Sequence, residues 1–298
     1  MAAARYFIQY ALFRAAVFAA RALPRNAALR LGEKLGGLAR FLLRKHAAIA
    51  ADNLRQAFPE KSAAELRQTL RAVFRHLGAS AMEILRVDLF KGKEDLERYF
   101  IYSGKEHLEQ AYALGKGVFL LSGHVGFWEG GSFFLPTLGF PTDCVAKRIK
   151  NPYIDRYFGK LRGACGVQVL DSKKGARRIL RSLAENRGVG VVLDQHITRS
   201  EAVPNLFFGR EVWTTPIITQ IAMKQGVPIV PMYFYRTPDF RYQVVIEPVI
   251  RFENEPGRDA ILRNTALLTA NIEAAVRRDI TQWFWVHRRW RTYDNKDA

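Results

Sequence analysis

The fold is decided by the stretch VFLLSGHVGFWEGG, residues 118–131, in which an apolar run leads into a histidine with glycines on either side. The apolar run predicts a buried strand, and the glycines predict a turn that carries His124. Residues five apart lie about 140° apart on an ideal helix, so His124 and Glu129 would not share a helical face. They can meet if His124 lies in the turn and Glu129 on the first turn of the following helix. The stretch therefore predicts a strand–turn–helix unit.

The chain around this unit alternates between short β-rich apolar runs and helical stretches. The last two expected strands, joined by residues 237–240, have the form of an antiparallel hairpin. The alternation predicts a three-layer α/β/α sandwich with a mixed, mostly parallel sheet. We expect strands at 117–122, 143–146, 167–170, 189–193, 227–235 and 242–250, and helices near 125–135, 151–164, 174–187, 213–225 and 259–278.

The first hundred residues have a helical pattern instead. Two apolar stripes recur at helical spacing there, and we interpret both as core positions. Ser62 and Glu65 have the spacing of a capping box that opens a helix shortly after Pro59. The first stripe consists of leucines at 31, 35, 38, 42 and 43, and the second of Leu66, Leu70, Phe74, Leu77, Met82 and Leu85.

Residues 1–25 form a region of their own, because their apolar run is interrupted by arginines. Arg14, Arg21 and Arg25 fall within a sector of about 40° on a helix. A spanning helix needs about 20 residues with few or no charges, so this region favours the plane of a membrane interface, as an anchor or interfacial helix. Packing against its own domain is the alternative. The remainder, 26–298, is expected to be one domain with a helical part at 26–100 and an α/β part at 101–298.

The composition favours an anionic partner. Among 298 residues, 46 Lys and Arg stand against 28 Asp and Glu, which gives a net charge of +18. Nucleic acid, anionic lipid headgroups and an acidic carrier protein all fit such a surface. The two cysteines, Cys144 and Cys165, form neither a CxxC pair nor a metal-type spacing, and we expect no cleavable signal peptide, because the apolar N-terminal stretch lacks a small-residue cleavage site. We therefore expect a reducing, cytosol-facing location.

His124 and Glu129 have the chemistry of a base and its partner. The end of a central strand is where α/β sheets place their sites. There the Glu129 carboxylate can hold one imidazole nitrogen while the other accepts a proton from an attacking hydroxyl. On these residues alone, a purely structural histidine beside a strand is an equal alternative.

The spacing HxxxxE after a strand resembles the HX4D/E motif of glycerolipid acyltransferases. Its surroundings resemble one branch closely, the late acyltransferases of lipid A biosynthesis (lauroyl and myristoyl transferases), over nearly the whole chain. The resemblance is carried by NLRQAFPE at 53–60, KRIKNP at 147–152, DQ at 194–195 with FFG at 207–209 and TT at 214–215, VPIVP at 227–231 and WVHRRW at 285–290.

This resemblance implies an O-acyl transfer that needs no cofactor. It implies that His124 is the general base and that Glu129 is its partner. The proton would come from the 3-hydroxyl of an acyl chain on a lipid A precursor, an anionic glycolipid, which then attacks a thioester. The implied donor is acyl carrier protein, with coenzyme A as the fallback. The implied location is the cytoplasmic face of a bacterial inner membrane.

The resemblance also assigns residues to substrate binding. Arg148 suits a phosphate or oxyanion clamp, because guanidinium offers a planar fork of donors. Asp194, with Gln195 beside it, is expected to orient His124 or Arg148, and a turn cap is an equal alternative for Asp194.

Two aromatic segments complete the implied site. Phe208 and Gly209 would line an acyl pocket or else fill the core. Residues 204–206 (PNL) stand where the family usually runs a proline directly into two phenylalanines, a departure that bears on chain selectivity and acceptor. The tail at 283–291 fits a nucleic-acid platform, a membrane anchor or a packed terminal element. The resemblance favours the last, with Arg288 or Arg289 reaching toward an anionic substrate.

Other functions find less support in the sequence. It has no nucleic-acid-binding signature, no G-x-S-x-G elbow and no P-loop. Asp194-Gln195-His196 lacks further ligands nearby, so we expect no metal. Two alternatives stay open: acyl transfer to another glycolipid or aminolipid, such as a phosphatidylinositol mannoside, and a non-catalytic scaffold that binds membrane or nucleic acid.

Overall fold

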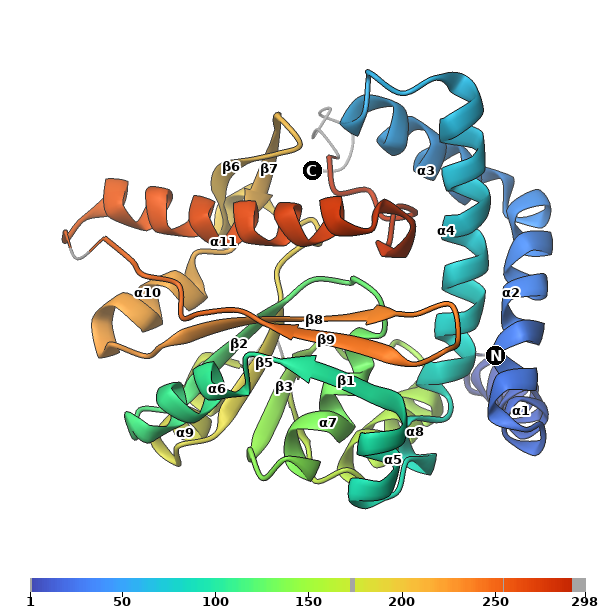
Figure 1. Ribbon diagram of the computed structural model, residues 1–298, viewed down its shortest axis with the longest axis horizontal. Helices are drawn as coiled ribbons and strands as arrows, with labels where there is room; N and C mark the ends of the chain where they lie inside the picture. The colour runs from blue at the N-terminus through green and yellow to red at the C-terminus, as the bar shows by residue number, and fades with distance from the viewer. Residues whose placement is uncertain (1, 172–174, 254, 291–298) are drawn as a thin grey trace.

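The computed structural model describes residues 2–171, 175–253 and 255–290. A seven-stranded sheet lies at its centre in the order β1-β9-β8-β2-β5-β3-β4, and β6 and β7 form a separate two-stranded sheet (Figure 1). The strands are β1 (Phe100–Ser103), β2 (Val118–Ser122), β3 (Thr142–Ala146), β4 (Gln168–Asp171), β5 (Gly188–Val192), β6 (Val203–Phe207), β7 (Arg210–Thr214), β8 (Ile229–Arg236) and β9 (Tyr242–Ile246).

Helices lie on both faces of the large sheet. In Figure 1, α10 and α11 lie above it and α5, α7 and α8 below it, while α1 and α2 stand at the right-hand edge beside α4. The α-helices are α1 (Ala2–Ala22), α2 (Arg25–Leu42), α3 (Arg44–Ala57), α4 (Ala63–Ile84), α5 (Gly92–Tyr99), α6 (Lys105–Ala113), α7 (Gly131–Thr137), α8 (Pro152–Gly163), α9 (Gly175–Ala184), α10 (Ile217–Gln225) and α11 (Arg258–Arg278). Short 3₁₀ turns include η1 (Val87–Leu89), η2 (Trp128–Gly130), η4 (Arg199–Glu201) and η5 (Ile280–Gln282).

The sheet is mixed and mostly parallel, as the sequence predicts. β2 pairs in parallel with both β5 and β8, and β3 pairs in parallel with β4 and β5. The predicted hairpin is confirmed, because β8 and β9 are antiparallel. β1 then pairs in parallel with β9, so these two strands run against the other five.

Alternation along the strands creates one core on each face of the sheet. In β2, Phe119 and Leu121 belong to the core that includes α11, while Val118 and Leu120 belong to the core that includes α7. Side chains of a strand point alternately to opposite faces, and both sets are buried here. A continuous apolar run such as 118–121 is typical of a strand covered on both sides.

Three strands were absent from the sequence prediction. β1 is four residues long, and the hairpin β6–β7 covers residues that were expected to be irregular or, at 213–214, helical. The expected helix near 213–225 begins only at Ile217, directly after Pro216. The strand expected to reach 250 ends at Ile246.

The first leucine stripe is not a core element, which corrects the prediction. α2 packs on α4 through glycines: a Cβ on Gly36 would lie 2.0 Å from the carbonyl oxygen of Phe74, and one on Gly78 would lie 2.0 Å from that of Gly32. The stripe points elsewhere. Its members on α2 form what we call the α2 leucine face, and they are 38–73% exposed: Leu31, Leu35, Leu38 and Leu42. The second stripe is confirmed as core at Leu70 and Phe74, on the helix that the Ser62 capping box begins.

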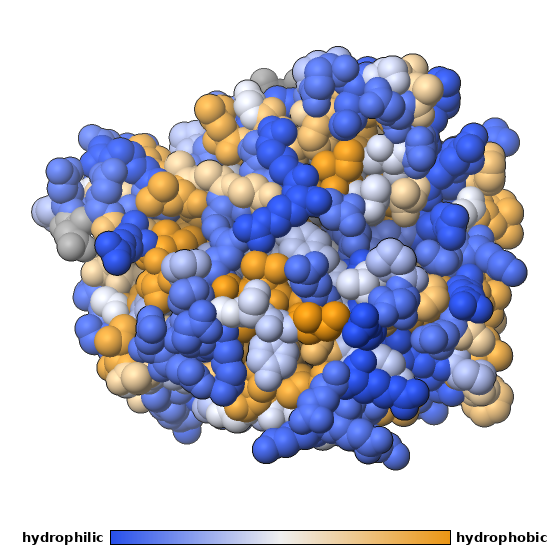
Figure 2. Space-filling view, in the orientation of Figure 1, coloured by the Kyte–Doolittle hydropathy of each residue, from blue (hydrophilic) through white to orange (hydrophobic). Residues whose placement is uncertain are grey.

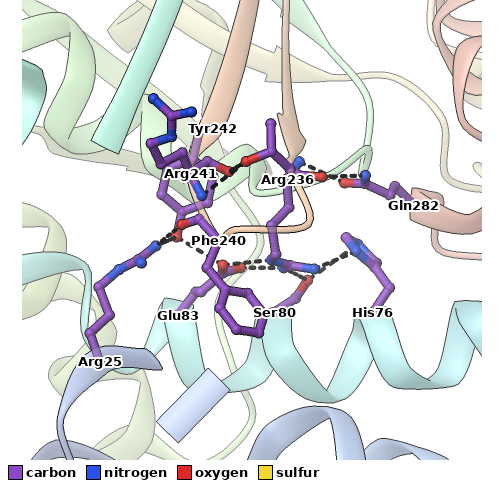
Figure 3. A network of polar contacts seen from close by, with 10 residues as sticks. Arg25, His76, Ser80, Glu83, Arg236, Phe240, Arg241, Tyr242 and Gln282 are labelled. Atoms are coloured by element: carbon purple, nitrogen blue, oxygen red, sulfur yellow. Dashed lines mark hydrogen bonds and ion pairs between the residues drawn. The ribbon is translucent and has the colours of Figure 1, made fainter. Parts of the chain in front are cut away.

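A buried polar network joins α4 to the β8–β9 hairpin (Figure 3). Arg236, at the end of β8, donates to both carboxylate oxygens of Glu83 and to Ser80, and its Nη1 lies 2.7 Å from Nδ1 of His76. Tyr242 donates to Glu83 at 2.8 Å. The guanidinium charge is therefore neutralised inside the protein, as a buried charge requires. The network fixes the helical part against the sheet.

Helix α1 packs on α8 with one side and is exposed on the other. Phe13 lies 5.1 Å from the ring of Tyr157, and Tyr10 stacks on Tyr153 at 5.5 Å. Outward-facing side chains such as Leu12 (69%) and Phe18 (76%) are exposed. Within the described residues, no helix has the length and apolar content needed to cross a bilayer. Membrane association of residues 1–25 stays a prediction.

Candidate active site

His124 and Asp194 meet because they follow paired strands. Ser122 at the end of β2 is in register with Val192 at the end of β5, and each candidate residue comes two positions later. Carboxyl ends of parallel neighbours share one edge of the sheet, where α/β proteins place their sites. Asp194 thus approaches His124 from the adjacent strand, although 70 residues separate them in sequence.

The turn that holds His124 depends on a close backbone approach. Gly126 has a φ of 60°, and a Cβ there would lie 1.7 Å from the carbonyl oxygen of Phe234. Its N–H donates to the carbonyl of Gln282 at 2.8 Å, and Phe127 N–H donates to Phe234 at 2.8 Å. The segment after His124 is therefore fastened between β8 and the C-terminal segment, and only glycine fits at 126.

Asp194 binds His124 through two atoms. The His124 backbone N–H donates to Oδ2 at 2.6 Å, and ring nitrogen Nδ1 lies 2.7 Å from Oδ1. Burial of the ring would lower the pKa of His124, but the Asp194 carboxylate raises that pKa above its ordinary value. An Nδ1–H held by a carboxylate leaves Nε2 as the nitrogen that accepts a proton. The contact has the geometry that the predicted orienting role requires, and the role itself stays a prediction.

Asp194 is itself fixed from a second direction. Its side chain is 1% exposed, and the indole N–H of Trp283 donates to Oδ2 at 2.8 Å. Burial would raise the pKa of Asp194, yet the bonds from His124 and Trp283 hold it well below its usual range. The carboxylate therefore stays ionised and cannot rotate away from the imidazole.

Glu129 has a different partner from the one expected. Its carboxylate accepts two bonds from Arg162 on α8, from Nε at 3.0 Å and Nη2 at 2.6 Å. This bidentate pair is only 14–16% exposed. Because the fork of the guanidinium occupies both oxygens, Glu129 does not hold the imidazole as predicted; Asp194 does. Glu129 acts on His124 through its charge, which contributes to raising the pKa of the imidazole.

Gln195 lies at the other ring nitrogen. Its amide nitrogen is 3.2 Å from Nε2 of His124. With the proton on Nδ1, Nε2 offers a lone pair, so the amide donates to it. A group that bonds to Nε2 from the cavity must therefore displace this amide.

A cavity of about 360 Å³ opens beside His124, Glu129 and Arg162. It lies against the sheet face that α7 and α8 cover, and its walls are largely apolar. Ligand pockets of this kind combine apolar walls with a few convergent polar groups. The apolar wall residues include Leu120, Leu135, Val145, Val167, Met232 and Phe234.

Three predicted binding residues lie away from this cavity. Arg148 is 74% exposed and pairs with Asp171 at 2.9 Å, and the arginine that lines the cavity is Arg162 instead. Phe208 and Gly209 form the two-residue turn between β6 and β7, with φ of 52° and 69°. A hairpin of this length favours positive φ at both positions.

Phe208 fills the core rather than lining an acyl pocket. Its ring packs on Phe58 at 5.3 Å and on Trp285 at 5.7 Å, and the guanidinium of Arg277 lies 4.4 Å from its centroid. The side chain is 6% exposed. This packing offsets the strain of a bulky residue at positive φ.

The C-terminal aromatic segment is a packed element, as the resemblance favoured, and it contacts the loop that carries Gln195. Arg289 is 1% exposed and donates to the carbonyls of Gln195 and Trp213, so it supports the Gln195 loop rather than reaching a substrate. Burial lowers the pKa of Arg289 to about 10. Asn53 donates to the carbonyl of Trp285 at 2.8 Å, which ties this segment to α3.

Two site residues were missed from the sequence, Arg162 and Trp283. Arg162 lies on the expected helix 151–164. A buried acid such as Glu129 requires a cation as its partner, but that helix carries three basic residues, and the sequence does not indicate which of them pairs with Glu129. In the sequence, Trp283 is one of several aromatic residues in the tail. An indole N–H needs a hydrogen-bond partner when it is buried, and this need is the signal that could have pointed to Trp283.

Comparison with known proteins identifies the family of this chain. A model of the bacterial lipid A biosynthesis acyltransferase family matches residues 1–292. A lipid A biosynthesis lauroyltransferase of Escherichia coli is 28% identical over 276 residues, 91% of this chain and 87% of that protein. A lipid A biosynthesis acyltransferase of Haemophilus influenzae is 23% identical over 88% and 81% of the two chains.

A more distant group matches part of the chain. A phosphatidylinositol mannoside acyltransferase of Mycolicibacterium smegmatis is 29% identical over 132 residues, 43% of each chain. The match of the family model over nearly the whole length decides the assignment. This chain, in which His124 is bonded to Asp194 and lines a largely apolar cavity, belongs to the bacterial lipid A biosynthesis acyltransferase family.

Proposed function

We propose that the protein transfers a fatty acyl group from an acyl thioester to a hydroxyl of a membrane glycolipid, with a lipid A precursor as the acceptor and His124 as the general base. One observation carries the proposal: Nδ1 of His124 is bonded to a buried, ionised Asp194, which leaves Nε2 basic at the edge of an apolar cavity. The family match supports an acyl group as the group that is transferred.

The reaction needs only this base and good positioning. The acceptor hydroxyl replaces the Gln195 amide at Nε2, and Nε2 takes its proton as the oxygen bonds to the thioester carbonyl carbon. The carbon–sulfur bond then breaks, and the imidazolium returns the proton to the departing sulfur. An ester and a thiol result, with no covalent intermediate on the protein. General-base catalysis supplies about 10² to 10⁴-fold, and positioning supplies much of the remainder.

The cavity and the ion pair have separate roles in this proposal. The apolar walls hold the acyl chain, and Arg162, fixed by Glu129, offers cationic donors to the developing oxyanion or to a phosphate of the acceptor. The protein works at the cytoplasmic face of the inner membrane, with acyl carrier protein as donor. A net charge of +18 suits an acidic carrier and an anionic lipid alike.

The proposal is tested by mass spectrometry of lipids after incubation with membrane-reconstituted protein. Acyl-carrier-protein and acyl-coenzyme A thioesters are supplied in parallel, with a lipid A precursor as acceptor. The wild type and His46→Ala, a change at an exposed histidine of α3, should add one acyl chain, and His124→Ala should not. Equal activity of His124→Ala and the wild type would exclude His124 as the base.

A second acceptor class is included because the mannoside acyltransferases match part of the chain. Transfer to a phosphatidylinositol mannoside or another lipid in a total extract, with none to the lipid A precursor, would keep acyl transfer and replace the acceptor. Absence of transfer to any lipid from either donor would overturn the enzymatic proposal and favour a membrane-binding scaffold.

A further inference from the structure

The apolar surface of this protein is concentrated at its N-terminal end. Of the 17 large hydrophobic residues that are exposed in the described chain, ten lie between residues 7 and 43. Four of these are on α1 and six are on α2 or at its end. Figure 2 shows hydrophobic residues at the right-hand edge, where Figure 1 places α1 and α2. Scattered exposed apolar residues need no explanation, but a concentration of this kind marks an interaction site.

The α2 leucine face is a continuous stripe. Spacings of four, three and four residues place Leu31, Leu35, Leu38 and Leu42 within a sector of about 60° on the helix. Their exposed fractions rise from 38% at Leu31 through 47% and 53% to 73% at Leu42. Phe41 and Leu43, beside the end of the stripe, are 62% and 49% exposed. The opposite side of α2 is occupied by α4 at the glycine contacts, so this stripe has no room to turn inward.

Cations border this stripe. Arg30 and Lys34 lie along one edge of it, and Arg44 and Lys45 follow its end; all four are exposed. The one acid on α2, Glu33, is paired with Arg75. Among the described residues, no ion pair joins the four cations to an acid. A leucine stripe with a basic border is the pattern of a helix that lies in a membrane interface and contacts anionic headgroups.

We infer that the α2 leucine face binds the surface of an anionic bilayer, with the leucines in the acyl boundary and the four cations at the headgroups. The inference extends the membrane location of the proposed function from α1 to α2 and rests on it. A second copy of the chain is a poorer occupant. In a twofold dimer the same basic border would face itself, with no free acid on α2 to pair with it.

The test is sedimentation of the full-length protein with vesicles of phosphatidylglycerol and phosphatidylcholine, and of phosphatidylcholine alone. The triple variant Leu35→Gln/Leu38→Gln/Leu42→Gln should bind anionic vesicles at least about tenfold more weakly than the wild type, because each leucine loses apolar contact with the bilayer. The matched control is Leu114→Gln/Leu206→Gln/Leu267→Gln, at leucines 42–65% exposed elsewhere, and it should bind as the wild type does.

The charge component has its own variant. Arg30→Gln/Lys34→Gln should weaken binding to the anionic vesicles and leave binding to neutral vesicles unchanged, and added salt should abolish the difference. Circular dichroism and urea unfolding establish that the variants fold; if the triple variant does not, Leu38→Gln and Leu42→Gln are measured singly.

Two results would overturn the inference. One is wild-type vesicle binding by the α2 triple variant. The other is a change from dimer to monomer, measured by light scattering without lipid, while vesicle binding is unaltered. Failure of the proposed reaction is distinguishable, because His124→Ala must still bind vesicles and the α2 variants must still acylate a detergent-dispersed acceptor.

Discussion

At the scale of single residues, the site contains two carboxylates with different tasks. Asp194 accepts bonds from both the backbone and the ring of His124, whereas Glu129 accepts both of its bonds from Arg162. One carboxylate bonds the imidazole and raises its pKa, and the other is paired with a cation at the cavity wall. Replacement of each should therefore have a different kinetic signature.

For Asp194 that signature is a change in the pH–rate profile. In the proposed reaction deprotonated His124 is the active form, so kcat/KM in the wild type should rise with pH and level off above the raised pKa of His124. Asp194→Asn removes the carboxylate that raises this pKa and leaves the burial that lowers it. The acid limb should move to lower pH, and the plateau should fall by about 10²-fold or more. Asp239→Asn, at an exposed carboxylate, is the control; an unmoved limb in Asp194→Asn would contradict the assignment.

For Glu129 the signature is coupling to Arg162. Glu129→Gln and Arg162→Gln should each reduce kcat/KM, and the double variant should lose about as much as either alone, since the residues act as one unit. The acid limb of Glu129→Gln should move less than that of Asp194→Asn, because Glu129 only supplements Asp194 in raising the pKa of His124. Strict additivity in this cycle, or a shift as large as that of Asp194→Asn, would return Glu129 to the role of imidazole partner.

The sequence predicts His124 at the end of a central strand, but not the carboxylate that bonds its ring. A buried strand followed by Gly123 and His124 is a local pattern, and so is an aspartate shortly after another buried strand. Which carboxylate reaches the ring depends on strand order: β2 pairs with β5, which brings Asp194 to Nδ1, and α8 brings Arg162 to Glu129. The two pairs are separated by 70 and 33 residues, so no periodic pattern in the sequence indicates that their members meet.

At the scale of elements, long periodic segments were predictable and short ones were not. Apolar runs in the sequence predict the central strands and the hairpin β8–β9. β1 has only four residues, three of them exposed, so it shows no buried pattern. The α2 leucines have helical periodicity, but periodicity reports a common face and not what covers it. Only the glycine contacts reveal that α4 covers the other side.

The contact between α2 and α4 predicts a contrast between adjacent glycines. A Cβ at Gly36 would collide with the backbone of Phe74, while one at Gly37 meets nothing closer than a side-chain carbon of Arg75 at 3.9 Å. Gly36→Ala should lower the free energy of unfolding by about 1–3 kcal/mol through overpacking. Gly37→Ala should raise it by up to about 1 kcal/mol through helix propensity. Urea unfolding measures both, and equal effects of the two changes would refute the close helix contact.

At the scale of the whole molecule, the buried network of Figure 3 makes stability depend on pH. Burial and the neighbouring Arg236 hold the pKa of His76 well below its ordinary 6.5. The folded protein keeps this ring neutral while the unfolded chain takes up a proton, so the free energy of unfolding must fall as pH drops below about 6.5. One such group changes the free energy of unfolding by at most about 1.4 kcal/mol per pH unit.

His76→Gln should remove that slope. Between about pH 7 and about pH 5, the free energy of unfolding of His76→Gln should fall less than that of the wild type, because the variant takes up one proton fewer on unfolding. His46→Gln, at an exposed histidine of α3, should keep the wild-type slope. Urea midpoints across this range provide the measurement, and parallel curves for His76→Gln and the wild type would show that His76 is not the group responsible.

The path of the chain through the sheet sets the order in which the molecule can form during synthesis. β2 lies near the centre, but its neighbours β5 and β8 are made after it, and Trp283, which closes over Asp194, comes later still. Chains emerge from the ribosome N-terminus first, so α1 to α4 precede every strand. A nascent chain therefore displays its outward leucines long before His124 and Asp194 can meet. A chain interrupted before Trp283 would hold all the strands and still leave the Asp194 carboxylate without its indole partner.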